Sequence, residues 1–157
     1  METTKQVSVF LENKPGRLAN VLLALAREKV NVVALTIMDS HEHSTLRLVT
    51  SDLAKTNEVL RSLNTTFAET EVLVVDLRNQ PGALAHVCEQ LASEHINIDY
   101  AYCSSGGRNG KVAGIFKVSN AGKAMRVLGT APNNSVRRRL EQRPLRNRQS
   151  YQAPGRR

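Results

Sequence analysis

The residues best suited to polar recognition occur twice in this sequence, in the same arrangement. Leu-Glu-Asn-Lys-Pro-Gly-Arg-Leu at residues 11–18 returns as Leu-Arg-Asn-Gln-Pro-Gly-Ala-Leu at residues 77–84, and each copy is followed by a further asparagine, Asn31 or Asn97. Asparagine carries a donor and an acceptor on one short side chain, and glycine lets a ligand approach the backbone closely. We expect backbone N–H groups of the helical turn after each Pro-Gly to be free to bind a carboxylate. The expected donors are Gly16, Arg17 and Leu18 in the first copy, and Gly82, Ala83 and Leu84 in the second.

Each asparagine also has a purely structural interpretation. Asparagine is common in turns, and Asn31 and Asn97 could simply end the preceding helices, because asparagine tolerates a left-handed backbone. The recurrence of all four asparagines with Pro-Gly favours the interpretation as ligand-binding residues.

Other reactive side chains give weaker patterns. His41 and His43 share a face of an extended segment, but no third ligand is visible nearby and a zinc site needs three or four. We therefore expect no metal and no cofactor. No nucleophile, base and orienting group occur at an informative spacing, which is not the pattern of an enzyme. Tyr100 and Tyr102 share one face of a predicted strand, at an expected buried seam.

The two motifs belong to an internal repeat. Residues 11–31 and 77–97 are identical at 11 of 21 positions, where unrelated segments would agree at about one or two. In each copy a short apolar run precedes Pro-Gly, and apolar residues then recur at helical spacing. These residues are Leu18, Val21, Leu22, Leu25 and Ala26 in the first copy, and Leu84, Val87, Cys88, Leu91 and Ala92 in the second. Each motif is therefore predicted to join a strand to an amphipathic helix.

The whole chain predicts an α+β fold of two ferredoxin-like βαββαβ repeats packed together. The expected strands are 7–11, 32–38, 45–50, 66–77, 97–103 and 112–118, and the expected helices are 17–29, 53–63, 83–95 and 120–128. Ser51 or Asp52 is expected to cap the second helix. No Gly or Pro lies between Leu63 and Gln80, so the last strand of the first repeat should run directly into the second repeat.

The predicted domains are residues 5–70 and 71–141, and the closing strand of the second, near residues 135–140, is weak. Residues 142–157 are expected to form a disordered basic tail. Residues 130–157 hold eight arginines and one acid, so they supply most of the net charge of +8. The hydrophobic content of 41% suits a globular protein. The chain has no apolar run of about 18 residues for a membrane span, no apolar signal peptide and no disulfide framework, so we expect a cytoplasmic protein.

A strand, Asn-x-Pro-Gly-x-Leu, a helix and an asparagine-led strand, present twice over residues 5–128, closely resemble the ACT domain. This is a small regulatory module of amino-acid metabolism. The resemblance implies that a free amino acid binds at the interface of two paired domains. The weak last strand and the basic tail are not features of that family.

The resemblance implies ligand-binding residues at Leu11, Asn13, Pro15, Gly16, Arg17, Leu18, Asn31, Leu77, Asn79, Pro81, Gly82, Ala83, Leu84 and Asn97. In ACT pairs of the side-by-side kind the second strands meet, which here would join residues 32–38 to residues 100–103. This arrangement predicts two crossed sites, one from residues 13–18 with Asn97 and one from residues 79–84 with Asn31. Within one copy, Asn13 and Asn31 should lie at opposite ends of the sheet.

The favoured function is an amino-acid-sensing regulatory protein that forms a homo-oligomer, such as a dimer, or binds an amino-acid biosynthetic enzyme. One alternative is a regulatory small subunit of an enzyme such as acetolactate synthase. A less favoured alternative is nucleic-acid binding, since ferredoxin-like folds also bind RNA. The chain is only 4% aromatic, and an arginine-rich tail alone gives salt-sensitive, non-specific affinity.

Overall fold

A computed structural model of the chain describes residues 1–39, 43–104 and 111–130. Its elements are β1 (Glu2–Glu12), α1 (Arg17–Arg27), β2 (Val32–Asp39), β3 (His43–Thr50), α2 (Leu53–Ser62), β4 (Phe67–Arg78), α3 (Ala83–Ser93), β5 (Ile98–Cys103), β6 (Lys111–Val118) and α4 (Ala121–Thr130). The predicted order of elements is confirmed over these residues. His41, the expected closing strand near residues 135–140 and the basic tail lie outside them.

The strands form one six-stranded sheet in the order β2-β3-β1-β4-β6-β5. The junction between the repeats is the continuous strand β4, as predicted from the absence of Gly and Pro. One part of β1 pairs with β3 and another with β4, and β4 in turn pairs with β6, so both long strands serve both repeats. Glu2 and Thr3 pair with Val74 and Leu73. The first residues of the chain therefore flank β4 where a closing strand of the second repeat would lie.

The β1–β4 pair lies at the centre of an internal pseudo-twofold. Equivalent residues of the two repeats are 66 positions apart, as Leu11 and Leu77 are. Lys5 pairs with Glu71, which is 66 positions later, so this pair maps onto itself when the repeats are exchanged. The two repeats thus diverge from the middle of a shared ribbon.

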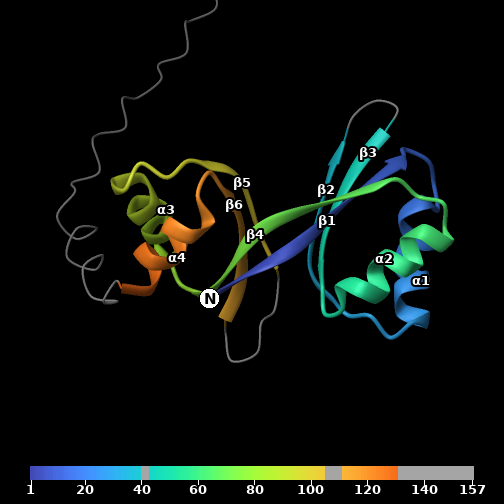
Figure 1. The fold of residues 1–157 in the computed structure, drawn as a ribbon, viewed down its shortest axis with the longest axis horizontal. Helices are drawn as coiled ribbons and strands as arrows, with labels where there is room; N and C mark the ends of the chain where they lie inside the picture. Colours follow the sequence, from blue (N-terminus) through green and yellow to red (C-terminus); the bar gives the residue numbers. More distant parts are fainter. Residues whose placement is uncertain (40–42, 105–110, 131–157) are drawn as a thin grey trace, which may run out of the picture.

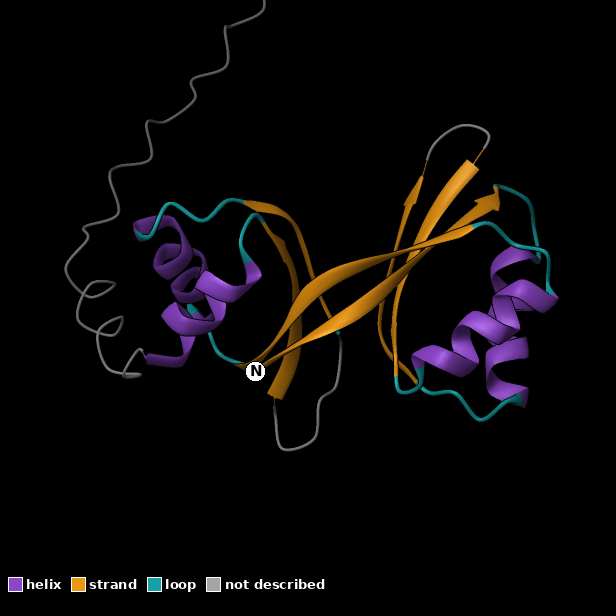
Figure 2. Ribbon diagram, viewed as in Figure 1, coloured by secondary structure: helices purple, strands orange, loops and turns teal. Residues whose placement is uncertain are grey.

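The molecule has four layers. The two halves of the sheet form the inner layers, and a pair of helices covers the outer side of each half. Figure 1 shows α1 and α2 at one end of the molecule and α3 and α4 at the other, and Figure 2 shows the two long strands crossing between them. Each helix pair covers a core of its own, centred on Leu25 and Leu48 in the first repeat and on Leu91 and Phe116 in the second. A third apolar cluster, formed by Ala34, Val49, Val72 and Ile115, lies on the helix-free side of the strands.

The expected side-by-side pairing of the second strands is wrong. β2 and β5 stand at the two ends of the strand order and are not hydrogen-bonded to each other. They approach through their faces, since Tyr102 on β5 packs against the cluster that contains Ala34 on β2. The physical reason is the unbroken β4, which ties both repeats to β1 and leaves β2 and β5 as the outer strands.

Local chemistry explains how the helices begin. Asp52 rather than Ser51 caps α2, because its Oδ1 accepts a hydrogen bond from the backbone N–H of Lys55 at 3.0 Å. Helices α1 and α3 instead begin after a glycine with a left-handed backbone, at φ 85° for Gly16 and φ 86° for Gly82. Of the apolar residues predicted on α1, Val21 and Leu25 are buried, whereas Ala26 is exposed.

Candidate ligand-binding groove

The Pro-Gly turn after β1 is held by its own backbone. The N–H of Lys14 donates to the carbonyl of Glu12 at 2.8 Å, and the N–H of Arg17 donates to the carbonyl of Lys14 at 3.3 Å. The prediction that the backbone N–H of Arg17 is free to bind a ligand is wrong, because this N–H donates a hydrogen bond within the turn. The same correction applies to Ala83, whose N–H donates to the carbonyl of Gln80.

Open space lies next to the glycine of this turn. A Cβ atom added to Gly16 would meet no heavy atom within 4 Å. No side chain caps the N-terminus of α1. A small ligand therefore has room to approach the first turn of this helix.

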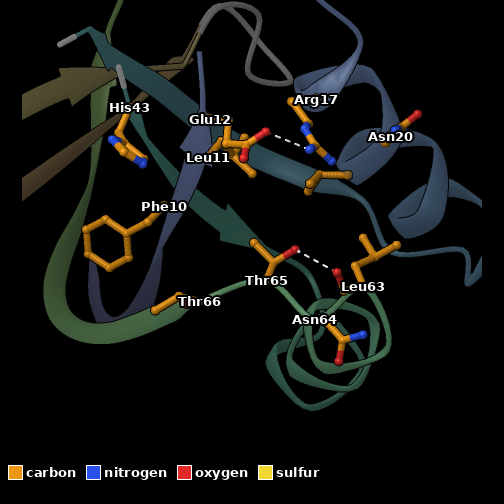
Figure 3. A pocket seen from close by; sticks show the side chains of 11 residues that line it. Phe10, Leu11, Glu12, Arg17, Asn20, His43, Leu63, Asn64, Thr65 and Thr66 are labelled. Carbon is orange, nitrogen blue, oxygen red and sulfur yellow. Dashed lines mark hydrogen bonds and ion pairs between the residues drawn. The ribbon is translucent and has the colours of Figure 1, made fainter. Parts of the chain in front are cut away.

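A groove of about 540 Å³ lies beside the turn, a size typical of small-molecule sites. From β1 and α1 it is lined by Phe10, Leu11, Glu12, Arg17, Asn20 and Val21. From β3 and the loop between α2 and β4 it is lined by His43, Leu63, Asn64, Thr65 and Thr66. All of these residues belong to the first repeat, and Figure 3 shows their side chains around the end of β1, with Phe10 pointing away from Leu63.

An ion pair at the rim brings opposite charges together. Arg17 Nη2 lies 2.6 Å from Glu12 Oε2, and Lys14 Nζ lies 3.3 Å from the same oxygen. Hydrogen bonds from Arg17 and then Lys14 hold the pKa of the Glu12 carboxyl below its ordinary value. The side chains of Arg17 and Glu12 are 51% and 45% exposed. Exposed ion pairs contribute little to stability. Each of these two side chains can therefore leave the other and bind a ligand group with little loss of stability.

Two large apolar side chains at the borders of the groove are exposed, one on β1 and one after α2. Phe10 is 47% exposed and Leu63 is 39% exposed. The N–H of Phe10 donates to the carbonyl of Thr66 at 3.0 Å, which ties the loop to β1. Asn64 in this loop has a left-handed backbone, at φ 50°. The loop therefore presents Leu63 and Thr65 to the end of β1 (Figure 3).

Asn31 and Asn97 directly precede β2 and β5 and make matching hydrogen bonds. The N–H of Asn31 donates to Ser51 Oγ at 3.0 Å and its carbonyl accepts from the N–H of Ser51 at 2.9 Å. Asn97 makes the same two contacts with Ser119. Neither asparagine ends a helix in the left-handed conformation. The residues with a left-handed backbone after α1 and α3 are Lys29 (φ 58°) and His95 (φ 55°).

The positions of these asparagines correct the crossed geometry. Leu11 pairs with Ser44 and Val32 pairs with Thr50, so Asn13 and Asn31 lie at opposite ends of the first half-sheet, as predicted. The crossed sites, however, relied on β2 pairing with β5, which does not occur. Asn97 is not among the residues that line the groove, and its Nδ2 donates to Asp99 Oδ1 at 2.9 Å.

The comparison with known families decides what this chain is. Residues 2–137 match the family described as the ACT domain pair. The chain belongs to this family.

Solved structures share this ACT pair's fold. Protein BT0572 from Bacteroides thetaiotaomicron is 35% identical, with a TM-score of 0.75 over 81% of this chain and 87% of that one. The ligand-free regulatory subunit of aspartate kinase from Thermus thermophilus is 15% identical, with a TM-score of 0.61 over 83% and 95%. The corresponding subunit from Thermus flavus is 17% identical, with a TM-score of 0.55 over 82% and 94%. No curated protein matches.

The second repeat of the ACT pair keeps the turn but has other side chains at three positions of the groove. Gly82 has the same backbone as Gly16. The positions of Phe10, Glu12 and Arg17 are taken by Asp76, Arg78 and Ala83. Asp76 instead lies 3.9 Å from the N-terminal ammonium group. The two turns are therefore alike in shape and different in chemistry.

Sequence reasoning missed most of this groove. Leu11 and Arg17 were predicted as site residues and line it, but Phe10, Glu12, His43 and the loop at residues 63–66 were not. The difference between Glu12 and Arg78 at equivalent positions was the available signal. The loop could not be found in this way, because only the fold brings it to the end of β1.

The remaining candidates among the described residues are metal ligands and cysteines. Over the described residues, no group of three or more His, Cys, Asp or Glu side chains could hold a metal. Cys88 and Cys103 are both free, and burial raises the pKa of the Cys88 thiol. No helix in the described ranges is long and apolar enough to cross a membrane.

Proposed function

We propose that this ACT pair is a non-catalytic regulatory module that binds one free α-amino acid in the groove beside the first Pro-Gly turn. The observation that carries the proposal is the Glu12–Arg17 ion pair at the rim of that groove, next to Gly16. An α-amino acid carries an ammonium and a carboxylate on one carbon. Glu12 and Arg17 offer the two opposite charges at the spacing of a hydrogen bond, so each can turn to one ligand group.

In this arrangement Arg17 holds the carboxylate with two parallel N–H donors, the geometry for which guanidinium is suited. Glu12 accepts from the ammonium. The N–H groups of Gly16 and Leu18 add donors at the positive end of α1. Asn13 and Pro15 shape the turn, and Leu11 lies at the base of the groove. Of the predicted site residues, Leu11 and Arg17 line the groove, and the others belong to the turn beside it.

The second turn, with Leu77, Asn79, Pro81, Gly82, Ala83 and Leu84, keeps the backbone of a binding turn. It has no equivalent acid and base, since Arg78 and Ala83 stand at the positions of Glu12 and Arg17. We propose that it is a weaker site or a purely structural turn. Asn31 and Asn97 then serve to join β2 to β3 and β5 to β6 through Ser51 and Ser119.

The test is calorimetry on the full chain with the twenty amino acids. Arg17→Ala and Glu12→Gln should each weaken the best ligand by about ten-fold or more, because hydrogen bonds between charged groups are stronger than those between neutral groups. Arg27→Ala and Glu28→Gln, near the other end of the same helix, are the matched controls and should leave affinity unchanged. N-acetylated and methyl-ester forms of the ligand should fail to bind. If no amino acid binds, or if both pairs of variants behave alike, the proposal is wrong.

A regulatory module needs a partner, and we propose that one surface of β2 binds a second copy of the chain. Val33, Leu35 and Ile37 form an exposed apolar row on this edge strand, 38%, 42% and 47% exposed. An edge strand with an exposed apolar row is a ready template for another strand. The same positions on β5 carry Asp99, Ala101 and Cys103, so the two edges do not complement each other. A closed twofold dimer through β2 is therefore favoured over an open chain of molecules.

Light scattering after size exclusion should find a dimer that Leu35→Lys converts to a monomer. Ala101→Lys, the same change at the equivalent position of the other edge, is the control and should leave the dimer intact. A monomeric wild-type chain would contradict self-association. The edge would then be available to a different protein, such as an amino-acid biosynthetic enzyme.

The choice of a biosynthetic enzyme as the regulated partner rests on analogy of fold. Regulatory subunits named for aspartate kinase share this fold at low identity. A small subunit of acetolactate synthase remains the alternative within the same class. Co-purification of the tagged chain from its own host, with and without the ligand, would separate these candidates.

A further inference from the structure

We infer that the groove prefers amino acids whose side chain carries a carboxylate, and that Lys14 at its rim binds this second carboxylate. The inference rests on the proposed function, because it assumes that Glu12 and Arg17 bind the ammonium and the α-carboxylate of the ligand. It names the chemical class of that ligand.

The rim of the groove carries more positive than negative charge. Lys14 Nζ and Arg17 Nη2 lie 3.3 Å and 2.6 Å from the same oxygen, Glu12 Oε2. Among the residues that the structure describes, these two cations share one acid, so one positive charge is left in excess. A ligand that adds a net negative charge would balance it.

Binding of the α-amino acid leaves Lys14 without its acid. Once Glu12 turns to the ammonium of the ligand and Arg17 to the α-carboxylate, Lys14 loses the carboxylate that it contacts. Among the described residues that line the groove, Glu12 is the only acid, so no other lining side chain can replace it. The side chain of Lys14 is 67% exposed and has a flexible stem of four carbons, so its ammonium can follow a carboxylate on the ligand.

Other classes of side chain gain less at this rim. A ligand with a basic side chain would place a further cation beside Lys14, and like charges repel each other. A neutral side chain would leave the excess charge uncompensated. The lining also includes amide and hydroxyl groups, which can donate hydrogen bonds to a carboxylate. These groups belong to Asn20, Asn64, Thr65 and Thr66.

The second repeat supplies the substitution that tests Lys14. Gln80 stands at the equivalent position. The N–H of Gln80 donates to the carbonyl of Arg78 at 2.8 Å, as the N–H of Lys14 donates to the carbonyl of Glu12 at 2.8 Å. Lys14→Gln therefore removes the charge and introduces a side chain that the same turn already accepts in the second repeat.

The experiment is calorimetry of the full-length chain with two pairs of ligands of equal shape, L-glutamate with L-glutamine and L-aspartate with L-asparagine. We expect the acid of each pair to bind about five-fold more tightly than its amide, the ratio that an exposed ion pair can provide. Added salt should reduce this ratio, because it screens exposed charges.

Lys14→Gln should bring the ratio close to one and leave the binding of the amides unchanged. Lys55→Gln is the matched control and should keep the ratio, because Lys55 is an exposed lysine of the same repeat that pairs with Asp52 instead. Melting temperatures check that both variants are folded.

Each possible result has a distinct meaning. Equal binding of acid and amide, or a preference that persists in Lys14→Gln, would overturn the inference and leave the proposed function standing if Arg17→Ala still weakens binding. Tightest binding by a neutral or basic amino acid would do the same. No binding by any of the twenty amino acids would overturn the proposed function itself.

Discussion

The hydroxyl of Tyr102 donates a hydrogen bond of 3.0 Å to Oε1 of Gln6, across the boundary between the two repeats. Gln6 is fully buried although it is polar. Its Nε2 donates to Tyr100 Oη at 3.0 Å and to Ser8 Oγ at 3.1 Å. Arg47, from the first repeat, lies 3.8 Å above the ring of Tyr100. This polar network fixes the helix-free faces of the repeats to each other, at the seam where the two tyrosines were expected.

Tyr102→Phe should destabilise the protein by about 1–3 kcal/mol, because it leaves a buried acceptor on Gln6 without its donor. Tyr100→Phe is the matched comparison. It should cost less, since Gln6 Nε2 keeps its bond to Ser8 and the Phe ring can still lie under Arg47. Urea unfolding with constant slope would measure both. Equal losses for the two variants would contradict this account of the network.

The alkaline limit of stability should depend on Tyr102. Burial, and then the neighbouring Tyr100, raise the pKa of Tyr102 above its ordinary value. A raised folded-state pKa means that the stabilising contribution is complete below the ordinary tyrosine value, about 10, and is lost as pH rises further. The melting temperature of the wild type should therefore fall more steeply above that pH than that of Tyr102→Phe. Parallel alkaline curves for the two proteins would argue against a buried neutral Tyr102.

The carboxyl of Glu12 should titrate below its ordinary pKa, with Arg17 as the largest cause and Lys14 as the next. Because the shift is downward, the ion pair is present above the ordinary value, about 4.3, and is lost as pH falls through the lowered one. Carbon NMR of the side-chain carboxyl should show a pKa that rises in Arg17→Ala and rises less in Lys14→Ala. A value unaffected by Arg17→Ala would mean that the pair does not form in solution.

Gly16→Ala and Gly82→Ala should each cost about 1–2 kcal/mol of stability, because both positions have a left-handed backbone. At Gly16 the added Cβ meets nothing within 4 Å, so the cost there is conformational and not a clash. The two variants should differ in function. Only Gly16→Ala is expected to weaken amino-acid binding, because only that turn borders the groove. Calorimetry on both variants, compared at equal stability, separates the two effects.

Much of the fold could be predicted from local signals. The Pro-Gly turns, the helical spacing of Val21 and Leu25 and the absence of a breaker before Gln80 each depend on neighbouring residues, and each was confirmed. The helices end two residues earlier than expected, at Arg27 and Ser93, because Lys29 and His95 turn the chain in the left-handed conformation.

The arrangement of the repeats could not be predicted in the same way. Whether the second strands pair or lie apart depends on the register between β1 and β4, which involves residues nearly seventy positions apart, such as Lys5 and Glu71. The same limit applies to the groove. Glu12 and Arg17 are close in sequence, but Leu63 and Thr66 reach them only through the packing of α2 and β4.

The central claim is that a free amino acid binds in the first repeat, between Glu12, Arg17 and the loop at residues 63–66. Amide NMR spectra of the full chain, titrated with each of the twenty amino acids in turn, test its location most directly. The account predicts shifts concentrated at residues 10–21 and 63–66, with residues 76–87 of the second repeat unchanged, and predicts that Arg17→Ala abolishes them at the same ligand concentration. Shifts centred on residues 79–84, or no shifts with any of the twenty amino acids, would contradict it.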